Sequence, residues 1–303
     1  MNKHFKKFKL ILMCLACMLV VTSLSTESVN AASKKSITLN KTSATIEVGK
    51  TTTIKVKKVK GLKNKNVTYK SSNKKVATVN ASGVVTGKKN GSATITVTSK
   101  SDKKVKATVK VKVVTDFFKK NKANIKKVGS EYTQKGFVFD YNSNLFLYNA
   151  KTTVKYADIY GCSWSNNYDI ISVDVATEVP IVNNASSIWF RYGMYTLDGV
   201  YVKPLPENTY FEQKEKRQIC SYAEWLTSSD PEYQIYKIHY QMLVPKNETV
   251  YLMYGGYKSL DSYKDSKNTD SKDGTKLKKK NLQKQYTYFR INASDAKKAL
   301  NRK

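Results

Sequence analysis

Residues 71–97 limit the fold of this chain more than any other stretch, because they combine strand periodicity with closely spaced turn residues. Residues 76–81 alternate with the two-residue period of a β-strand, and Ala93, Ile95 and Val97 give a further strand an apolar side. Ser82-Gly83 and the segment 87–91, which has glycine at both ends, supply turns, since glycine adopts positive φ freely. The stretch therefore predicts three short strands and two tight turns.

This order of residues resembles the bacterial Ig-like group 2 domain, the invasin and intimin type of surface module. The resemblance covers about residues 36–113, because Ser-Ser-Asn at 71–73, Val-Ala-Thr-Val at 76–79 and both glycine turns occur in the family's order. Tyr69 departs from the tryptophan that often precedes the serine pair, yet either ring suits a sandwich core. The resemblance implies a β-sandwich over 34–113 that spaces or displays something outside a cell, and it implies no chemistry.

The N-terminus has the pattern of an export signal. Four lysines precede an apolar run over 10–21, and Val29-Asn30-Ala31 offers small residues to a signal peptidase. A membrane anchor is one alternative, but a span needs about 20 apolar residues. A lipoprotein signal at Cys14 or Cys17 is another, and the residues before both cysteines fit it poorly. We expect a signal peptide over 1–31, no transmembrane segment in the mature chain, and a secreted, cell-surface or cell-wall location.

The chain is strongly basic, with a formal net charge of +31. Residues 33–113 hold 21 lysines against only Glu47 and Asp102, a net charge of +19. Such a field attracts polyanions and is weakened by salt. The predicted electrostatic partners are cell-wall polyanions such as teichoic acids, or acidic polysaccharides. A merely solvated lysine surface is the alternative, and no motif for specific nucleic-acid recognition is present.

Beyond residue 113 the composition changes, which marks a domain boundary. Residues 114–130 predict a linker or short helix with Phe117, Phe118 and Ile125 on its buried side. A larger and tyrosine-rich segment, 131–292, follows. The last stretch, 293–303, predicts a basic C-terminal tail or helix.

The segment 131–292 reads as a second β-sandwich, because many short alternating runs are separated by turn residues. Asp198-Gly199 lies between two of these runs and predicts a two-residue hairpin. The segment loosely resembles the Ig-like sandwiches of small extracellular Gram-positive proteins. The predicted fold class is therefore all-β, with two tandem Ig-like sandwiches and a short linker helix.

No catalytic, cofactor-binding or metal site is recognised. Once the signal is removed, His239 is the only histidine, and the polar phase of its strand predicts an exposed surface residue. Cys162, in Gly-Cys-Ser-Trp, invites comparison with papain-type enzymes, but Ile159 stands where those enzymes have cysteine. The carboxylate pair of a glycan hydrolase is assembled in space and cannot be excluded in this way.

Two further sets of residues are candidates for special roles. Cys162 and Cys220 remain in an exported chain, where an even count permits a disulfide, and two buried thiols are the alternative. Aromatic side chains that could contact a ligand are Trp164, Tyr192, Tyr195, Tyr201 and Trp225, with core packing as the commoner role of such residues.

Together these patterns predict an exported, non-enzymatic binding or adhesion protein, in which an Ig-like stalk carries a partner-binding β-sandwich. The predicted partner of the second domain is a host or bacterial surface glycan or protein. A carbohydrate-binding module protein is the alternative, and a glycan hydrolase with an unrecognised carboxylate pair is the third hypothesis.

Overall fold

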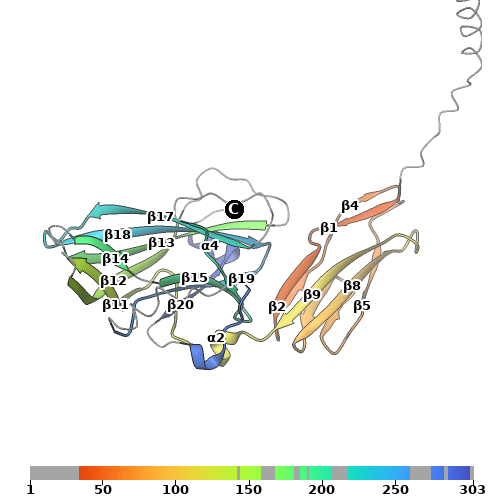
Figure 1. The fold of residues 1–303 in the computed structure, drawn as a ribbon. Helices are drawn as coiled ribbons and strands as arrows, with labels where there is room; N and C mark the ends of the chain where they lie inside the picture. Colours follow the sequence, from red (N-terminus) through yellow and green to blue (C-terminus); the bar gives the residue numbers. More distant parts are fainter. Residues whose placement is uncertain are drawn as a thin grey trace, which may run out of the picture. The chain divides into compact units, whose positions relative to one another are not determined.

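The structure is a computed structural model that describes residues 34–141, 144–157, 168–180, 185–189, 191–206, 217–259, 274–282 and 286–300. Residues 36–303 form one compact unit. The described residues are mainly β-strands that build two sandwich domains, so the all-β prediction is confirmed (Figure 1). The predicted signal peptide, 1–31, lies outside them. Among the helices of the described part, none has the length and apolar character to cross a membrane.

The first domain packs a four-stranded sheet against shorter strands. The four-stranded order is β2-β9-β8-β5, formed by Ser43–Glu47, Lys106–Val114, Gly91–Ser99 and Val67–Ser71. The shorter strands are β3-β7-β6, formed by Thr51–Thr53, Val84–Gly87 and Ala77–Val79, and the pair β1-β4, formed by Ser36–Leu39 and Val56–Lys60. Strands β6, β7 and β8 are the three that residues 71–97 predict.

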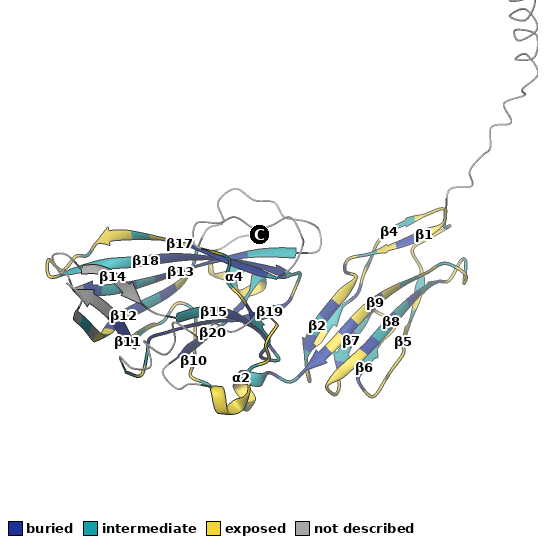
Figure 2. Cartoon of the chain, viewed as in Figure 1, coloured by how far each residue is buried: buried dark blue, intermediate teal, exposed yellow. Residues whose placement is uncertain are grey.

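Side chains along β8 and β9 alternate between the core and the surface (Figure 2). The inward positions carry Ile95 and Val97 on β8 and Val109 on β9, all fully buried. Between β6 and β7, Gly83 has a φ of 78°, and a Cβ there would collide with the Ile54 carbonyl oxygen and the Tyr69 ring. The turn prediction is therefore confirmed, because only glycine fits both the backbone and the space.

The second domain packs a six-stranded sheet on a five-stranded one. The six-stranded order is β14-β11-β12-β13-β18-β17, formed by Ala185–Trp189, Glu131–Tyr141, Asn144–Ala157, Tyr168–Pro180, Tyr233–Pro245 and Gln218–Thr227. The five-stranded order is β10-β20-β19-β15-β16, formed by Ile125–Lys126, Thr287–Asn292, Thr249–Gly255, Arg191–Thr196 and Tyr201–Val202. A hairpin is present at Asp198-Gly199, since β15 and β16 pair antiparallel across it. The predicted two-residue loop is wrong, because Thr196 lies opposite Val200 and three residues, 197–199, connect them.

One face of each sheet meets in the main core, where Val173 and Ile238 of the six-stranded sheet pack with Leu252 and Phe289 of the five-stranded one. The other face of the five-stranded sheet is covered by the segment that follows the first domain. Its helix α2 (Phe117–Lys120) is capped by the Asp116 carboxylate, which accepts from two backbone amides.

The segment 114–130, predicted as a linker or short helix, is packed into the second domain. The Phe118 ring is fully buried, with centroid distances of 4.3 Å to Tyr251 and 4.8 Å to Tyr288. Strand β10 then pairs in parallel with β20. A short 3-10 helix, η2 (Lys279–Asn281), precedes β20 in the chain. Strand β20 is followed directly by helix α4 (Ala293–Ala299), which lies in the segment predicted as a C-terminal tail or helix.

Candidate functional site

Strand β17 lies at the edge of the six-stranded sheet among the described strands and pairs with β18 along its whole length. Its first four residues are buried, and the Leu205 amide donates to the Ile219 carbonyl on that half. From Tyr222 onward every residue but Glu224 is exposed, and this exposed end is visible in Figure 2. The strand therefore changes from a core element to a surface element midway.

Three large apolar side chains are exposed on this second half. Tyr222 is 37% exposed, Trp225 51% and Leu226 38%. We call these three residues the β17 patch. The Trp225 ring packs against the Tyr236 ring of β18, at a centroid distance of 4.7 Å. Because side chains alternate along a strand, Tyr222 and Leu226 lie on one face of β17 and Trp225 lies on the other. The patch therefore includes both sides of the exposed strand edge, and exposed apolar side chains of this kind are typical of binding surfaces.

A charged cluster holds this half of β17 to its neighbours. His239 of β18 lies between two carboxylates, with Nδ1 2.7 Å from Asp174 Oδ1 and Nε2 2.9 Å from Glu224 Oε1. Lys237 Nζ contacts the same two carboxylates at 3.2 and 3.3 Å. Because a neutral imidazole has a single N–H, only the imidazolium can donate both hydrogen bonds. We call these four residues the His239 cluster.

The expectation that His239 is an exposed surface residue is wrong, because its exposed fraction is 8%. The Tyr222 ring stacks on the imidazole at a centroid distance of 4.2 Å and an interplanar angle of 13°. The flanking carboxylates cover the two ring nitrogens. The alternation along the strand correctly predicts that His239 lies on its polar side. The sequence does not show that the ring of Tyr222, from the neighbouring strand, covers this side chain.

The electrostatics of the His239 cluster favour the charged form of Glu224. The hydrogen bond from His239 lowers the pKa of Glu224, and the Lys237 ammonium adds to this. Burial acts to lower the pKa of Lys237, but Asp174 and Glu224 raise it on balance. A general acid in glycan hydrolysis needs a raised carboxyl pKa, and Glu224 shows the opposite.

The aromatic residues proposed as ligand contacts are dispersed. Tyr195 is buried beneath Phe118, and Tyr201 packs against Tyr195 at 5.2 Å. Tyr192 directs its hydroxyl to the Ser221 hydroxyl at 3.0 Å. Trp164 lies outside the described residues. Among the four that are described, only Trp225 is exposed, so they do not form one platform.

Sequence reasoning missed Tyr222 and Leu226. The run Tyr-Ala-Glu-Trp-Leu-Thr over 222–227 has no strict alternation of apolar and polar residues, so it gives no periodic signal of an exposed strand. The useful signal was the turn-rich Ser-Ser-Asp-Pro that follows at 228–231, which ends the strand soon after its apolar residues.

Comparison with known proteins adds one finding on the first domain. Residues 34–111 match the bacterial Ig-like domain (group 2). This agrees with the resemblance over 36–113, and such domains are typically extracellular, which indicates a surface or adhesion-type protein in general. No curated protein matches the chain.

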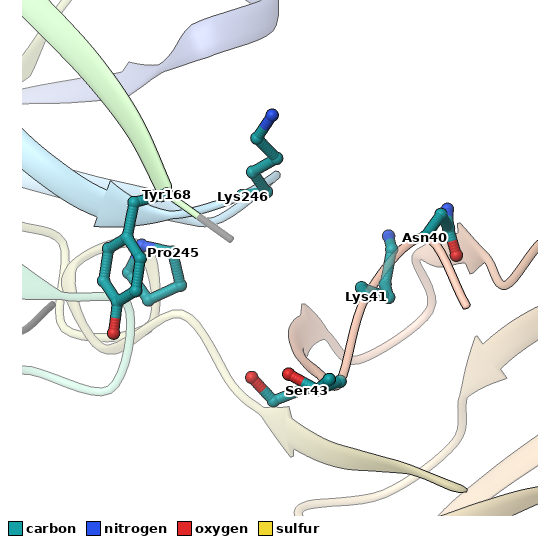
Figure 3. Close-up of a pocket in the computed structure, with 7 residues that line it drawn as sticks. Asn40, Lys41, Ser43, Tyr168, Pro245 and Lys246 are labelled. Carbon is teal, nitrogen blue, oxygen red and sulfur yellow. The ribbon is translucent and has the colours of Figure 1, made fainter. Parts of the chain in front are cut away.

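A small pocket involves the loop after β1 of the bacterial Ig-like domain (Figure 3). Its volume is about 200 Å³, and its lining residues are Asn40, Lys41, Thr42, Ser43, Tyr168, Pro245 and Lys246. Burial lowers the pKa of Lys41, and the charge of Asp169 opposes this. The Lys41 ammonium already donates to the Thr52 hydroxyl at 2.8 Å, so we assign the pocket no ligand.

The remaining candidates fall partly outside the described residues. Cys220 is almost fully buried in β17, and Cys162 is not described, so their disulfide stays a prediction. In the described part of the chain, no three or more His, Cys, Asp or Glu side chains gather in a way that could hold a metal ion.

Proposed function

We propose that the chain is an exported, non-enzymatic binding protein. In this proposal the bacterial Ig-like domain acts as a spacer, and the second sandwich binds a partner through the β17 patch. The observation that carries the proposal is the exposure of Tyr222, Trp225 and Leu226 within five positions of one edge strand, on the two sides of its exposed edge. Tryptophan and tyrosine are the side chains most often dominant at protein interfaces. The typical location of group 2 domains and the N-terminal pattern support export.

An exposed apolar edge strand is a liability unless it has a use. Edge strands are commonly protected by lysine, proline or a bulge, because free edges pair with other chains. The exposed half of β17 has none of these, and Glu224 is its only charged residue. A binding role for this strand explains why its apolar residues are exposed.

The partner is a glycan or protein on a host or bacterial surface. A carbohydrate-binding module is the second candidate function, and the half-exposed Trp225 ring favours it, since sugars stack on flat aromatic faces. The hydrolase hypothesis has less support. Asp174 and Glu224 converge on His239, but the lowered pKa of Glu224 keeps that carboxyl ionised rather than able to donate a proton.

Truncation of Trp225 tests the β17 patch. The chain lacking residues 1–31 is assayed on a printed glycan array and on intact bacterial and host cells, in about 1 M salt, where charge interactions are screened within about 3 Å. We expect Trp225→Ala to weaken binding by about thirtyfold, the equivalent of about 2 kcal/mol for a central interface residue.

Leu226 and Leu147 provide the matched comparison. Both are exposed leucines of the six-stranded sheet, 38% and 43% exposed, but Leu147 lies on β12. Leu226→Ala should weaken binding and Leu147→Ala should not. Equal losses in the two variants, or full binding by Trp225→Ala, would contradict the proposal.

A further inference from the structure

The outer face of the four-stranded sheet in the bacterial Ig-like domain has an unusually uniform chemistry. Its outward side chains on three neighbouring strands are Thr68 and Lys70 on β5, Thr94, Thr96 and Thr98 on β8, and Lys106, Thr108 and Lys110 on β9. We call these eight residues the Lys/Thr face. To this face the three strands contribute hydroxyl and ammonium groups, and neither a carboxylate nor an aromatic ring. The fourth strand, β2, adds Ser43 and Thr45 on the same side, and its one carboxylate, Glu47, lies at the far end, level with Val114 of β9.

Strand register arranges these groups in rows. One row runs Thr68, Thr98, Lys106, and the next runs Lys70, Thr96, Thr108. A third row pairs Thr94 with Lys110. Each row therefore carries one lysine. Successive rows are two residues apart along the strands, a spacing of about 6.8 Å.

The lysines of the face are available for a ligand. In the described part of the chain, Lys70, Lys106 and Lys110 are exposed and take part in no ion pair. Lys112, the next outward residue of β9, differs, because its ammonium lies 2.7 Å from the Asp198 carboxylate. Three cations on one sheet face, none in an ion pair with a described residue, produce a positive field that a polyanion can neutralise.

The side chains of the Lys/Thr face favour some classes of polyanion over others. Single-stranded nucleic acid is bound largely by stacking of its bases on aromatic rings, and the face has none. Tryptophan, tyrosine and arginine, which dominate protein interfaces, are also absent from the outward side of its three strands. Tyr168 and Arg217 of the second domain adjoin only one end of the face, where they line a hollow together with Thr94 and Lys110. Lysine ammonium and threonine hydroxyl groups are instead suited to phosphate oxygens and to the hydroxyl groups of a polyol.

We propose that the Lys/Thr face binds a linear phosphodiester polymer of polyols, the chemistry of teichoic acid, which runs along the strands with one phosphate at each row. The proposal deepens the predicted attraction to polyanions and rests on the proposed location outside the cell. It does not involve the β17 patch. The first domain would then fix the protein on the wall, while the second domain binds its own partner.

The test uses purified polyglycerol phosphate and the chain lacking residues 1–31. Calorimetric titrations over a range of salt concentrations give the affinity and its salt dependence. The face variant is Lys70→Gln, Lys106→Gln and Lys110→Gln combined. The matched control is Lys55→Gln, Lys58→Gln and Lys60→Gln combined, which removes the same charge at exposed lysines in and beside β4.

We expect the face variant to lose at least tenfold in affinity. Its slope of log K against log salt should fall by about 2, since each contact to a flexible phosphate chain contributes about 0.7. The control should keep most of the affinity and the slope. A second face variant, Thr96→Val with Thr98→Val, keeps the charge and the strand preference, and it should bind the polymer several-fold more weakly.

Three outcomes would overturn the proposal. The first is an equal loss in both lysine variants, which indicates net charge alone. The second is oligo-dT bound as tightly as the polymer, which indicates nucleic acid. The third is equal binding of a carboxylated polysaccharide, which indicates no preference for phosphate. Trp225→Ala should bind the polymer normally, so failure of the β17 proposal and failure of this one are distinguishable. Circular dichroism verifies that each variant is folded.

Discussion

The cores of the two β-sandwich domains are packed with different kinds of side chain. The core of the first consists of valine, isoleucine and alanine, such as Ile54, Ile95 and Val109. The core of the second includes fully buried tyrosines, and burial raises the pKa of both Tyr240 and Tyr254. The distinctive feature of the first domain is therefore its lysine-rich surface, whereas that of the second is its tyrosine-containing interior.

Buried tyrosines place a further demand on the second domain, because each hydroxyl needs a partner. Tyr254 has the Thr177 hydroxyl at 3.2 Å, and Tyr251 donates to the Asp116 carboxylate at 2.8 Å. The hydroxyls of Tyr132 and Tyr240 have no hydrogen-bond partner among the described residues. The tyrosine core of the second domain therefore contains polar groups that the aliphatic core of the first domain lacks, and only some of them have a partner among the described residues.

The sharpest test of the comparison is Phe118→Ala. If the segment after the first domain is part of the second, loss of this fully buried ring should destabilise the second domain by about 3–5 kcal/mol. The first domain should be unaffected. All three tryptophans lie beyond residue 131, so denaturant unfolding followed by tryptophan fluorescence reports the second domain alone.

Phe117→Ala is the control for this variant, because its ring is only half-buried beside the same cluster. A smaller loss of stability is expected. Equal stability of Phe118→Ala and the parent chain would show that 114–130 is only a linker. By the same reasoning, a fragment that begins at residue 131 should be less stable than one that begins at 114.

Much of the first domain is predictable from sequence, because its strands and turns are determined by residues that are close together in the chain. Strand period and glycine turns over 71–97 specify β6, β7 and β8, and the alternation along β9 specifies its inward valines. The predicted hairpin at Asp198-Gly199 is likewise a local signal. In each case a few neighbouring residues determine both the backbone conformation and which side chains point to the core.

The candidate sites depend on contacts between residues far apart in sequence, so they were less predictable. His239 meets Asp174 and Glu224 only because three strands pair in one register. The burial of Phe118 beneath the five-stranded sheet likewise requires tertiary packing. Trp225, one of the aromatic residues proposed as ligand contacts, is exposed because β17 is an edge strand. The order of the strands in a sheet cannot be deduced from the local sequence.

The glycine turn of the first domain gives a test of intermediate size. Gly83→Ala should destabilise the first domain by about 1–3 kcal/mol, since the backbone has positive φ and the new Cβ would meet the Ile54 carbonyl. Gly49→Ala is the matched control, because it also has positive φ but open space around it, and about 1 kcal/mol is expected.

Thermal unfolding followed by far-UV circular dichroism measures both glycine variants. Tryptophan fluorescence should show an unchanged second domain in each. Equal effects of the two substitutions would mean that backbone strain alone, and not the contact of Gly83 with Ile54 and Tyr69, limits this turn. A change in the tryptophan signal would mean that the domains unfold together.

The smallest expected effect concerns the His239 cluster and its dependence on pH. In the folded chain the hydrogen bond from His239 holds the pKa of Glu224 below its ordinary value of 4.5. The stabilisation is therefore fully present above that value and is lost as the pH falls through the lowered pKa. Because the Glu224 side chain alone is 42% exposed, although the residue as a whole is half-buried, screening keeps the contribution to about 0.2–1 kcal/mol.

Glu224→Gln should accordingly lower the free energy of unfolding at about pH 6, and the difference from the parent chain should shrink in acid, as the pH falls through the lowered pKa and the Glu224 carboxyl loses its charge. Glu232→Gln removes an exposed glutamate that joins no ion pair in the described part of the chain, and it should change stability little at either pH. Tryptophan fluorescence again isolates the second domain. A difference for Glu224→Gln that is the same at both pH values would show that packing, rather than the charge of this carboxylate, holds β17 to β18.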